Sequence, residues 1–388
     1  MGYQLNQEII KTLQNGHTEV VELIKELCKI PAPLNGEKAR AEFCKKWLEA
    51  AGAKGVYIDE VYNVVFPYHC ENSNDISVFM AHMDTVFPDT VPMPLREADG
   101  KLYCPGVGDD TANLAMLLLT IKYILQNKLT PDNGCLFVCN SGEEGLGNLK
   151  GSKSIMKNFA GRVRDFYSFD GFMSSYVNYS VGSTRYKIEV KTEGGHSFAN
   201  FGNKNAIAYL SALITELYKL QVAPNGHNTY NVGMIKGGTS VNTIAQQAEM
   251  LFEFRSDVKE NLDAMMKFLE EKIKEYQAMG VEIKVDVLGV RPCMGDVDKN
   301  AQAALDHKIE EIVTLYYGKT PGSESSSTDC NIPYSYGVPA IAIGGYMGEG
   351  THTREEWIYL DSLKQGYPLI VATVLDHYRN NHKALFQN

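Results

Sequence analysis

The stretch Ile76-Ser-Val-Phe-Met-Ala81 is a short apolar run, and His82-Met-Asp84 follows it directly. Two similar runs, Cys135-Leu-Phe-Val-Cys139 and Phe166-Tyr-Ser-Phe169, come later, and a helical pattern from about Thr111 to Asn127 separates the first run from the second. Continuous apolar runs that alternate with helices are typical of parallel strands buried on both faces. This region therefore predicts an α/β fold with a mostly parallel sheet flanked by helices.

The same alternation of helical patterns and apolar runs extends towards both ends of the chain. Helical patterns cover residues 18–30 and 36–51 before the first run. After about residue 292, a helical pattern over 300–317, the apolar run Ala340-Ile-Ala-Ile343 and a helical pattern over 361–379 resume it. We therefore expect the first and last parts of the chain to build one sheet.

The pattern between these parts is different. Arg185-Tyr-Lys-Ile-Glu-Val-Lys191 alternates as a half-exposed antiparallel strand does. Further strands are expected at 230–235, 248–254 and 283–287, with helices over 204–220 and 259–278. The sequence thus predicts a discontinuous domain, residues 1–181 and 292–388, interrupted by a smaller α+β domain, residues 182–291.

Composition narrows the classes of function. The 388 residues carry a formal net charge of −10, and no basic stripe is visible, which argues against a nucleic-acid partner. No apolar segment reaches the length of a membrane span and no secretory signal pattern opens the chain, so we expect a cytoplasmic protein without a membrane partner. The eight cysteines are scattered, as reduced buried thiols are.

His82 and Asp84 are the first candidate site residues, because they lie at the carboxyl end of a predicted strand. If the strand extends that far, their i, i+2 spacing places both side chains on one face. In open α/β sheets, binding sites are built at that end. A surface His–Asp pair fits the spacing equally well.

Four other predicted loops carry acids or a histidine. Asp109 and Asp110 precede a helix, Glu143-Glu144 and Asp170 follow apolar runs, and His352 lies in a glycine-rich loop after the last run. Each feature has an ordinary interpretation: a helix-capping acid, a solvated acidic turn, an Asp-Gly turn or a surface histidine. Five sheet-end loops that each offer His, Asp or Glu indicate a shared metal site instead.

Taken in order, the His-x-Asp, Gly-Asp-Asp, Glu-Glu-Gly and Asp-Gly motifs and the late histidine resemble the M20 family of metallopeptidases, particularly its peptidase T branch of tripeptide aminopeptidases. The resemblance extends to Glu37 after the Pro31-Ala-Pro33 segment, to Asn63, and to Gly194-Gly-His196. The chain departs from the family where Asp-Asp-Lys is usual, because it has Asp109-Asp-Thr-Ala-Asn113, with Thr111 in the place of the lysine.

The resemblance implies two divalent metal ions in each chain. Asp109 would bridge them, His82 and Asp170 would complete one site, and Glu144 and His352 would complete the other. The mixture of imidazole and carboxylate ligands favours Zn²⁺, and Mn²⁺ or Co²⁺ would suit the same ligands.

The resemblance also gives roles to residues that bind no metal. Glu143 would be the general base, Asp84 would orient His82, and the Asp109–Asp110 peptide would be cis. In the inserted domain, a lid or dimerisation domain in this family, His196 would stabilise the oxyanion. Asn242 and Arg255 would bind a substrate carboxylate, and a homodimer would form through the inserted domain.

The function expected from the resemblance is an aminopeptidase that releases the first residue of tripeptides or other short peptides. A deacetylase or other N-acyl-amino-acid amidohydrolase of the same family is the enzymatic alternative, because one scaffold serves both reactions. The non-enzymatic alternative is a metal-binding module that has lost catalysis. Retention of Glu143 together with Glu144 argues against that loss.

Overall fold

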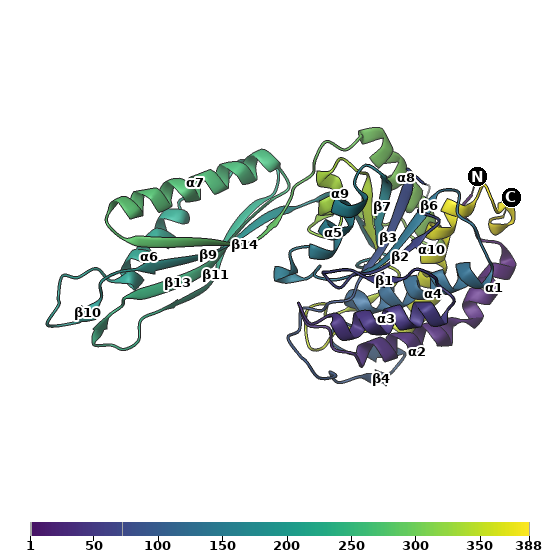
Figure 1. Cartoon of the computed structure of the whole chain (residues 1–388), viewed down its shortest axis with the longest axis horizontal. Coiled ribbons are helices and arrows are strands. Elements are labelled where there is room, and N and C mark those ends of the chain that lie inside the picture. The colour runs from purple at the N-terminus through teal and green to yellow at the C-terminus, as the bar shows by residue number, and fades with distance from the viewer. Residues whose placement is uncertain (1, 72, 388) are drawn as a thin grey trace. The chain divides into compact units, whose positions relative to one another are not determined.

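A computed structural model describes residues 2–71 and 73–387, and the chain divides into two units (Figure 1). Unit 1 comprises the residues up to Tyr179 together with those from Gly295 onwards, and unit 2 is Ser180–Met294. The predicted boundaries, 181/182 and 291/292, lie two and three residues from these positions. Each unit has its own hydrophobic core.

Unit 1 is built on an eight-stranded sheet in the order β1-β2-β6-β3-β7-β16-β8-β15. The neighbours β6, β3, β7 and β16 are parallel, whereas β1, β2 and β8 pair antiparallel. The strands are β1 (Tyr57–Ile58), β2 (Val64–Tyr68), β3 (Ile76–His82), β6 (Gly134–Asn140), β7 (Val163–Ser168), β8 (Ser175–Ser180), β15 (Gly322–Ser326) and β16 (Ala340–Ile343). The prediction of a mostly parallel sheet in an α/β fold is confirmed.

The parallel strands are apolar throughout because helices cover the sheet. Every residue of β3 and β6 is buried. The helices of unit 1 are α1 (Gln7–Asn15), α2 (His17–Cys28), α3 (Lys38–Ala50), α4 (Asn113–Gln126), α5 (Lys150–Phe159), α8 (Lys299–Tyr317), α9 (Asn331–Ser335) and α10 (Leu363–Leu375). Phe79, Phe137 and Tyr167 stack across three neighbouring strands and belong to the core that these helices close.

A second, smaller sheet of unit 1 was not predicted. Its order is β17-β18-β5-β4, with strands β4 (Arg96–Ala98), β5 (Lys101–Tyr103), β17 (Gly348–Glu349) and β18 (Trp357–Tyr359). It joins segments more than two hundred residues apart, since Trp357 pairs with Tyr103. Its strands pack partly through cation–π contacts, such as that of Lys101 Nζ, 3.5 Å from the Trp357 ring centroid. They therefore lack the run of apolar residues by which a strand is recognised in a sequence.

Unit 2 is a four-stranded antiparallel sheet in the order β11-β13-β9-β14, with two helices. Its elements are β9 (Gly182–Lys191), β11 (Asn228–Gly237), β13 (Gln247–Ser256), β14 (Glu282–Arg291), α6 (Ala206–Leu217) and α7 (Lys259–Ala278), and the short strands β10 (Gly195–His196) and β12 (Thr243–Ile244) form a separate pair. Ile188, Val190 and Phe254 lie on the buried face of this sheet and pack in one core with Leu213 and Leu269 of the helices.

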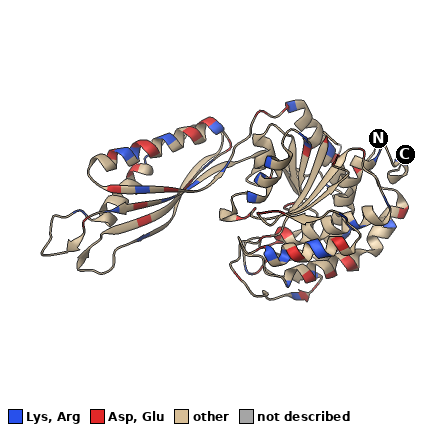
Figure 2. Cartoon of the chain, in the orientation of Figure 1, with Lys and Arg blue, Asp and Glu red and all other residues tan. Residues whose placement is uncertain are grey.

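Acidic and basic side chains alternate along α7 and along the outer helices of unit 1, as Figure 2 shows. Ion pairs at i, i+3 and i, i+4 such as Lys259–Asp263 and Lys272–Glu275 account for part of this pattern. Among the described residues, no helix is both long and apolar enough to cross a bilayer.

Candidate metal centre

The predicted ligands follow the carboxyl ends of the parallel strands. His82 is the last residue of β3, Glu143 and Glu144 follow β6, and Asp170 follows β7. Parallel strands end at the same edge of a sheet, and the N–H of Met83 donates to the carbonyl of Asn140 there at 2.8 Å. The sheet therefore gathers side chains from distant parts of the sequence into one place.

Asp109 lies at the centre of the group. It belongs to an irregular turn, Val107–Ala112 (η1), and the Asp109–Asp110 peptide is cis, as the resemblance implied. Its Oδ1 is 3.0 Å from Nε2 of His82, and its Oδ2 is 3.0 Å from Nε2 of His352. The two oxygens of one carboxylate thus face two different imidazoles, which is the arrangement that a bridging ligand requires.

Two candidate ligand sets share Asp109. In one, ligand atoms of His82, Asp109 and Asp170 all lie within 4.8 Å of one another. In the other, ligand atoms of Asp109, Glu144 and His352 are equally close, and Nε2 of His352 is 3.2 Å from Oε1 of Glu144. The structure brings together all five residues that the resemblance named as ligands.

The two histidines differ in exposure. The side chain of His82 is 1% exposed, whereas that of His352 is 55% exposed, and the backbone of His352 has a φ of 65°. Positive φ is uncommon in residues other than glycine, and histidine is among those that adopt it more often. His352 is therefore held by its loop, and His82 by the packing around the sheet.

The charges of the group call for cations. Burial raises the pKa of Glu144 to about 7, and burial together with the charge of Asp109 raises the pKa of Asp170 well above its ordinary value. Hydrogen bonds to Asp109 and Glu144 raise the pKa of His352 to about 10. The buried carboxylates repel one another when they are ionised, and the imidazoles beside them are favoured in their protonated form. Divalent cations fit such a set of donors, because they would balance the negative charge.

The carboxylate of Asp84 contacts a different part of the site from the one expected. Nδ1 of His82 contacts the backbone carbonyl of Asp84 at 3.0 Å, while the nearest carboxylate oxygen is 3.7 Å away. The carboxylate instead accepts the backbone N–H groups of Glu143 at 3.1 Å and Glu144 at 2.9 Å. Asp84 thus orients the imidazole through its main chain and the Glu143-Glu144 loop through its side chain.

Glu143 and Glu144 are both 6% exposed. One oxygen from each lies within 4.8 Å of a ring nitrogen of His82, and those two oxygens are equally close to each other. A carboxylate beside the ligands can exchange a proton with a substrate bound there, so the geometry suits Glu143 as a general base. The same geometry would also allow Glu143 to act as a ligand.

The departures from the family pattern fall next to the site. Nδ2 of Asn113 donates to Oδ1 of Asp110 at 2.7 Å, and its Oδ1 accepts the N–H of Gly345 at 2.7 Å. Asp110 in turn accepts the backbone N–H of His82 at 2.9 Å. Asn113 therefore links the loops that carry the candidate ligands, while Thr111 is buried near the guanidinium of Arg40.

Sequence inspection missed two buried acids at this end of the sheet. Asp329 is fully buried and accepts a hydrogen bond from Nδ2 of Asn140 at 2.5 Å. Glu356 is 2% exposed and accepts three backbone N–H bonds from the segment around Asp109, and burial raises its pKa to about 7. Glu356 lies in the polar run Thr353-Arg-Glu-Glu356, so its composition gave no signal of burial.

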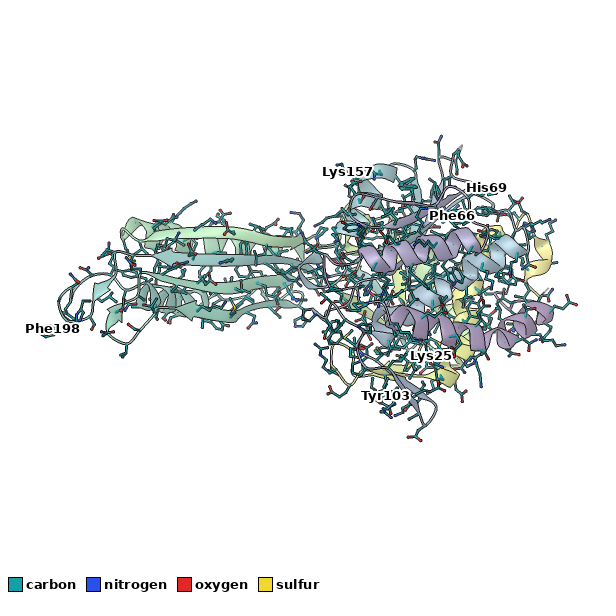
Figure 3. All side chains as sticks on the ribbon, turned by 60° about the horizontal axis from the view of Figure 1, so that its bottom comes forward. Lys25, Phe66, His69, Tyr103, Lys157 and Phe198 are labelled. Atoms are coloured by element: carbon teal, nitrogen blue, oxygen red, sulfur yellow. The ribbon has the colours of Figure 1, made fainter. Side chains whose placement is uncertain are left out.

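His196 lies in unit 2, where β10 pairs with β12. Its Nδ1 accepts the backbone N–H groups of Phe198 at 3.2 Å and Ala199 at 3.3 Å. Because Nδ1 is an acceptor, the proton of a neutral imidazole is on Nε2, which is then a donor. Phe198 is 88% exposed, and Figure 3 shows it at the end of the unit.

Asn242 lies beside His196, because its carbonyl accepts the N–H of Ser197 at 2.9 Å. Arg255 lies in the four-stranded sheet, near the end of β13, where it pairs with Ser183. At roughly 3.3 Å per residue, β13 separates Gln247, at the Asn242 end, from Arg255 by about 26 Å. Asn242 and Arg255 of one chain therefore cannot hold the same substrate carboxylate.

The comparisons with known proteins agree with this geometry. A family model described as "Peptidase family M20/M25/M40" matches residues 78–376. Carboxypeptidase G2 of Pseudomonas sp. (strain RS-16) is 26% identical over 312 residues, covering 77% of this chain and 73% of its own length.

Solved structures share the fold. The aminopeptidase PepT of Bacillus cereus matches with a TM-score of 0.72 at 20% identity, over 93% of this chain and 98% of its own. The M20 family metallo-carboxypeptidase Sso-CP2 of Sulfolobus solfataricus matches with a TM-score of 0.75 at 14% identity, over 93% and 99%. The family match spans most of the chain and includes both candidate ligand sets. This protein therefore belongs to peptidase family M20/M25/M40.

Proposed function

We propose that this protein is a two-metal aminopeptidase that releases the N-terminal residue of tripeptides or similarly short peptides. The observation that carries the proposal is the shared carboxylate of Asp109, whose two oxygens face the His82 and His352 ends of two ligand sets. Enzymes of this family depend on metal ions. Zn²⁺ is the metal that we propose, because the ligands combine imidazole and carboxylate.

The residues have separate roles in amide hydrolysis. His82, Asp109 and Asp170 would hold one ion, and Asp109, Glu144 and His352 the other. Bound there, the ions would supply Lewis-acid polarisation of the scissile carbonyl and acidify the attacking water. Glu143 accepts the proton of that water on its carboxylate and passes it to the departing amine nitrogen.

His196 supplies a hydrogen bond to the carbonyl oxygen as negative charge develops on it. The support for this role is its tautomer, because the loop occupies Nδ1 and leaves Nε2–H as a donor. The chain enters unit 2 beside Ser183 and leaves it beside Arg291, and these residues pair at one end of the sheet. His196 lies at the other end.

His196 could reach the ligands of unit 1 by a closure of unit 2 or from a second copy of the chain, and we propose the second copy. In a homodimer formed through unit 2, Arg255 of one chain and Asn242 of its partner could then hold one substrate. The proposed setting is the cytoplasm, where free short peptides and reduced thiols occur together. All eight cysteines are buried and unpaired.

Two other activities have specific support. The similarity to carboxypeptidase G2 favours release of the C-terminal residue of a substrate. Similarity to an acetylornithine deacetylase of Myxococcus xanthus, 23% identical over 316 residues, favours removal of an acyl group. A metal-binding module without catalysis has less support, because Glu143 remains beside the ligand sets.

One experiment separates these activities. Purified protein would be analysed for bound metal and then tested with free tripeptides, the same tripeptides acetylated at the amino terminus, and N-acetylated amino acids. An aminopeptidase cleaves only the first group, a carboxypeptidase also cleaves the second, and a deacylase cleaves the third. Turnover of the acetylated tripeptides or of the acetylated amino acids would reject the aminopeptidase proposal.

A further inference from the structure

Glu356 holds the main chain that leads to Asp109. Its Oε2 accepts the N–H of Gly106 at 2.6 Å, and its Oε1 accepts the N–H groups of Gly108 and Asp109 at 2.9 Å each. Each oxygen of a carboxylate can accept backbone N–H groups. Three of them converge here on one buried carboxylate, so the main chain at Asp109 is fixed from this side.

The direction of the Asp109 side chain depends on that main chain. One oxygen lies 3.0 Å from Nε2 of His82, and the other lies 3.0 Å from Nε2 of His352. A small rotation at Asp109 would lengthen one distance and shorten the other. Glu356, which accepts the N–H of this residue, therefore controls how the carboxylate is shared between the two ligand sets.

Glu356 also belongs to the loop that carries His352. It lies four residues after the histidine, and its carbonyl accepts the N–H of Cys104 at 3.2 Å. The outer part of the loop is tied by Arg354, whose guanidinium is 2.7 Å from the carboxylate of Asp89. Because the side chain of His352 is 55% exposed, packing alone does not place it, and these two anchors on the loop do.

We propose that Glu356 is a positioning residue that couples the two metal sites, because one carboxylate fixes both the bridging Asp109 and the loop of His352. This inference rests on the two-metal site of the proposed function. It predicts that a change at Glu356 weakens both ions together, although Glu356 is itself in neither ligand set.

Glu356→Gln is the informative variant, because it keeps the shape and removes half of the acceptor capacity. A glutamine has one carbonyl oxygen, so its amide group would face either the N–H of Gly106 or the two N–H groups of Gly108 and Asp109. A donor placed against a donor cannot bond. The turn at Asp109 would then shift.

The test measures metal binding directly. Metal-free wild-type protein and Glu356→Gln would be titrated with Zn²⁺ by calorimetry and with Co²⁺ by visible absorption. Loss of a group that orients a ligand typically costs about 10–100-fold in metal affinity, so we expect both equivalents to weaken by that factor. We also expect the Co²⁺ spectrum to change, since the geometry of the bridge changes.

Asp132→Asn is a matched control. Asp132 accepts the backbone N–H groups of Asn380 and Asn381 at 3.0 Å each, and it precedes β6, at the opposite end of the strand from Glu143. Its substitution also removes a carboxylate that ties two loops, and should leave metal affinity and spectrum unchanged. Glu356→Asp, which keeps the charge but is one methylene shorter, should weaken both equivalents and serves as the test if Glu356→Gln does not fold.

The outcomes separate the two proposals. Wild-type protein that binds fewer than two ions would overturn the two-metal function and this inference with it. If the wild type binds two ions, the inference is overturned when the Glu356 variants have wild-type affinity and spectrum, or when only one equivalent weakens. A lower melting temperature with unchanged metal binding would show a purely structural role and would also overturn it.

Discussion

The backbone N–H of Glu144 donates to Oδ2 of Asp84 at 2.9 Å, and this bond ties a candidate metal ligand to the loop that follows β3. The other oxygen of Asp84 accepts the N–H of Glu143 at 3.1 Å. The side chain of Asp84 therefore acts on the acidic loop, and the imidazole of His82 is oriented by the carbonyl of the same residue.

Asp84→Asn tests this division. The substitution leaves the main-chain carbonyl in place and replaces one acceptor oxygen by an amide that cannot accept the N–H of Glu144 or Glu143. We expect the ion held by Glu144 and His352 to weaken by about 10–100-fold, while the ion held by His82 and Asp170 changes little. Stepwise metal titration gives both affinities. If only the ion held by His82 and Asp170 binds more weakly, the carboxylate of Asp84 orients the imidazole of His82, as the sequence predicted.

Glu143→Gln should separate proton transfer from metal binding. The variant removes a proton acceptor without removing a ligand, so metal content should stay at the wild-type value while kcat falls by about 10²–10⁴-fold. Elemental analysis and steady-state kinetics on the same preparation provide the two values. Loss of metal from this variant would mean that Glu143 and Glu144 have the reverse roles. The geometry allows this too, because an oxygen of each lies within 4.8 Å of a ring nitrogen of His82.

His196→Ala should lower kcat far more than it raises KM, because the proposed bond forms only as charge develops on the carbonyl oxygen. Loss of one such donor costs about 2.7–4 kcal/mol of transition-state stabilisation. Mixing inactive Glu143→Gln and inactive His196→Ala chains then tests the partner. If His196 acts on the neighbouring chain, a mixed dimer contains one intact site and activity returns. Wild-type turnover of His196→Ala alone would make it an ordinary surface histidine.

The stability of the protein should depend on pH through His377, at the opposite end of the sheet from the candidate ligands. Burial, reinforced by the charges of Lys308 and Arg164, holds the pKa of His377 well below its ordinary value. Nδ1 lies 2.9 Å from Oγ of Ser77, and Asp376, the nearby acid, pairs with Lys308 at 3.3 Å. The folded state therefore keeps this imidazole neutral, whereas the unfolded chain protonates it below about pH 6.5.

The sign follows from proton binding. The unfolded state takes up the extra proton, so this contribution to stability is complete above about pH 6.5 and falls by up to about 1.4 kcal/mol per pH unit below it, until the folded-state pKa is reached. Urea unfolding between pH 7.5 and 5 would show a steeper loss for the wild type than for His377→Gln, which cannot titrate. Parallel slopes would contradict the assignment.

The sequence revealed the parts of the fold in which pattern and burial coincide. The central strand Ile76–His82 is buried at every position, so its apolar run was visible without structural information. The two-residue strand Gly348–Glu349 and the polar strand Gly322–Ser326 have no such pattern, because backbone pairing defines them: Gly348 pairs with Ile358, and β15 lies beside β8. Helix α4 begins at Asn113, two residues after the predicted start, because the irregular turn Val107–Ala112 precedes it.

The candidate site shows the same limit. The residues that meet at the sheet edge were identified from motif order, and the structure places the five candidate ligands together. Of the residues that hold them, Asp84 was expected to orient His82 through its carboxylate, and Glu356 was not identified. Asp84 and Glu356 act on backbone N–H groups, and no spacing in the sequence records which main-chain donors a carboxylate will meet.

The unequal exposure of the two candidate imidazoles has a kinetic consequence. An ion beside His82 would be enclosed, since that side chain is 1% exposed, while an ion beside His352 would lie against a side chain that is 55% exposed. In the proposed centre, a chelator would therefore strip the two ions in sequence, beginning with the one at His352. The outer position would exchange with the metals of the surrounding medium and the inner one would retain the ion acquired earlier, so that mixed-metal enzyme would accumulate.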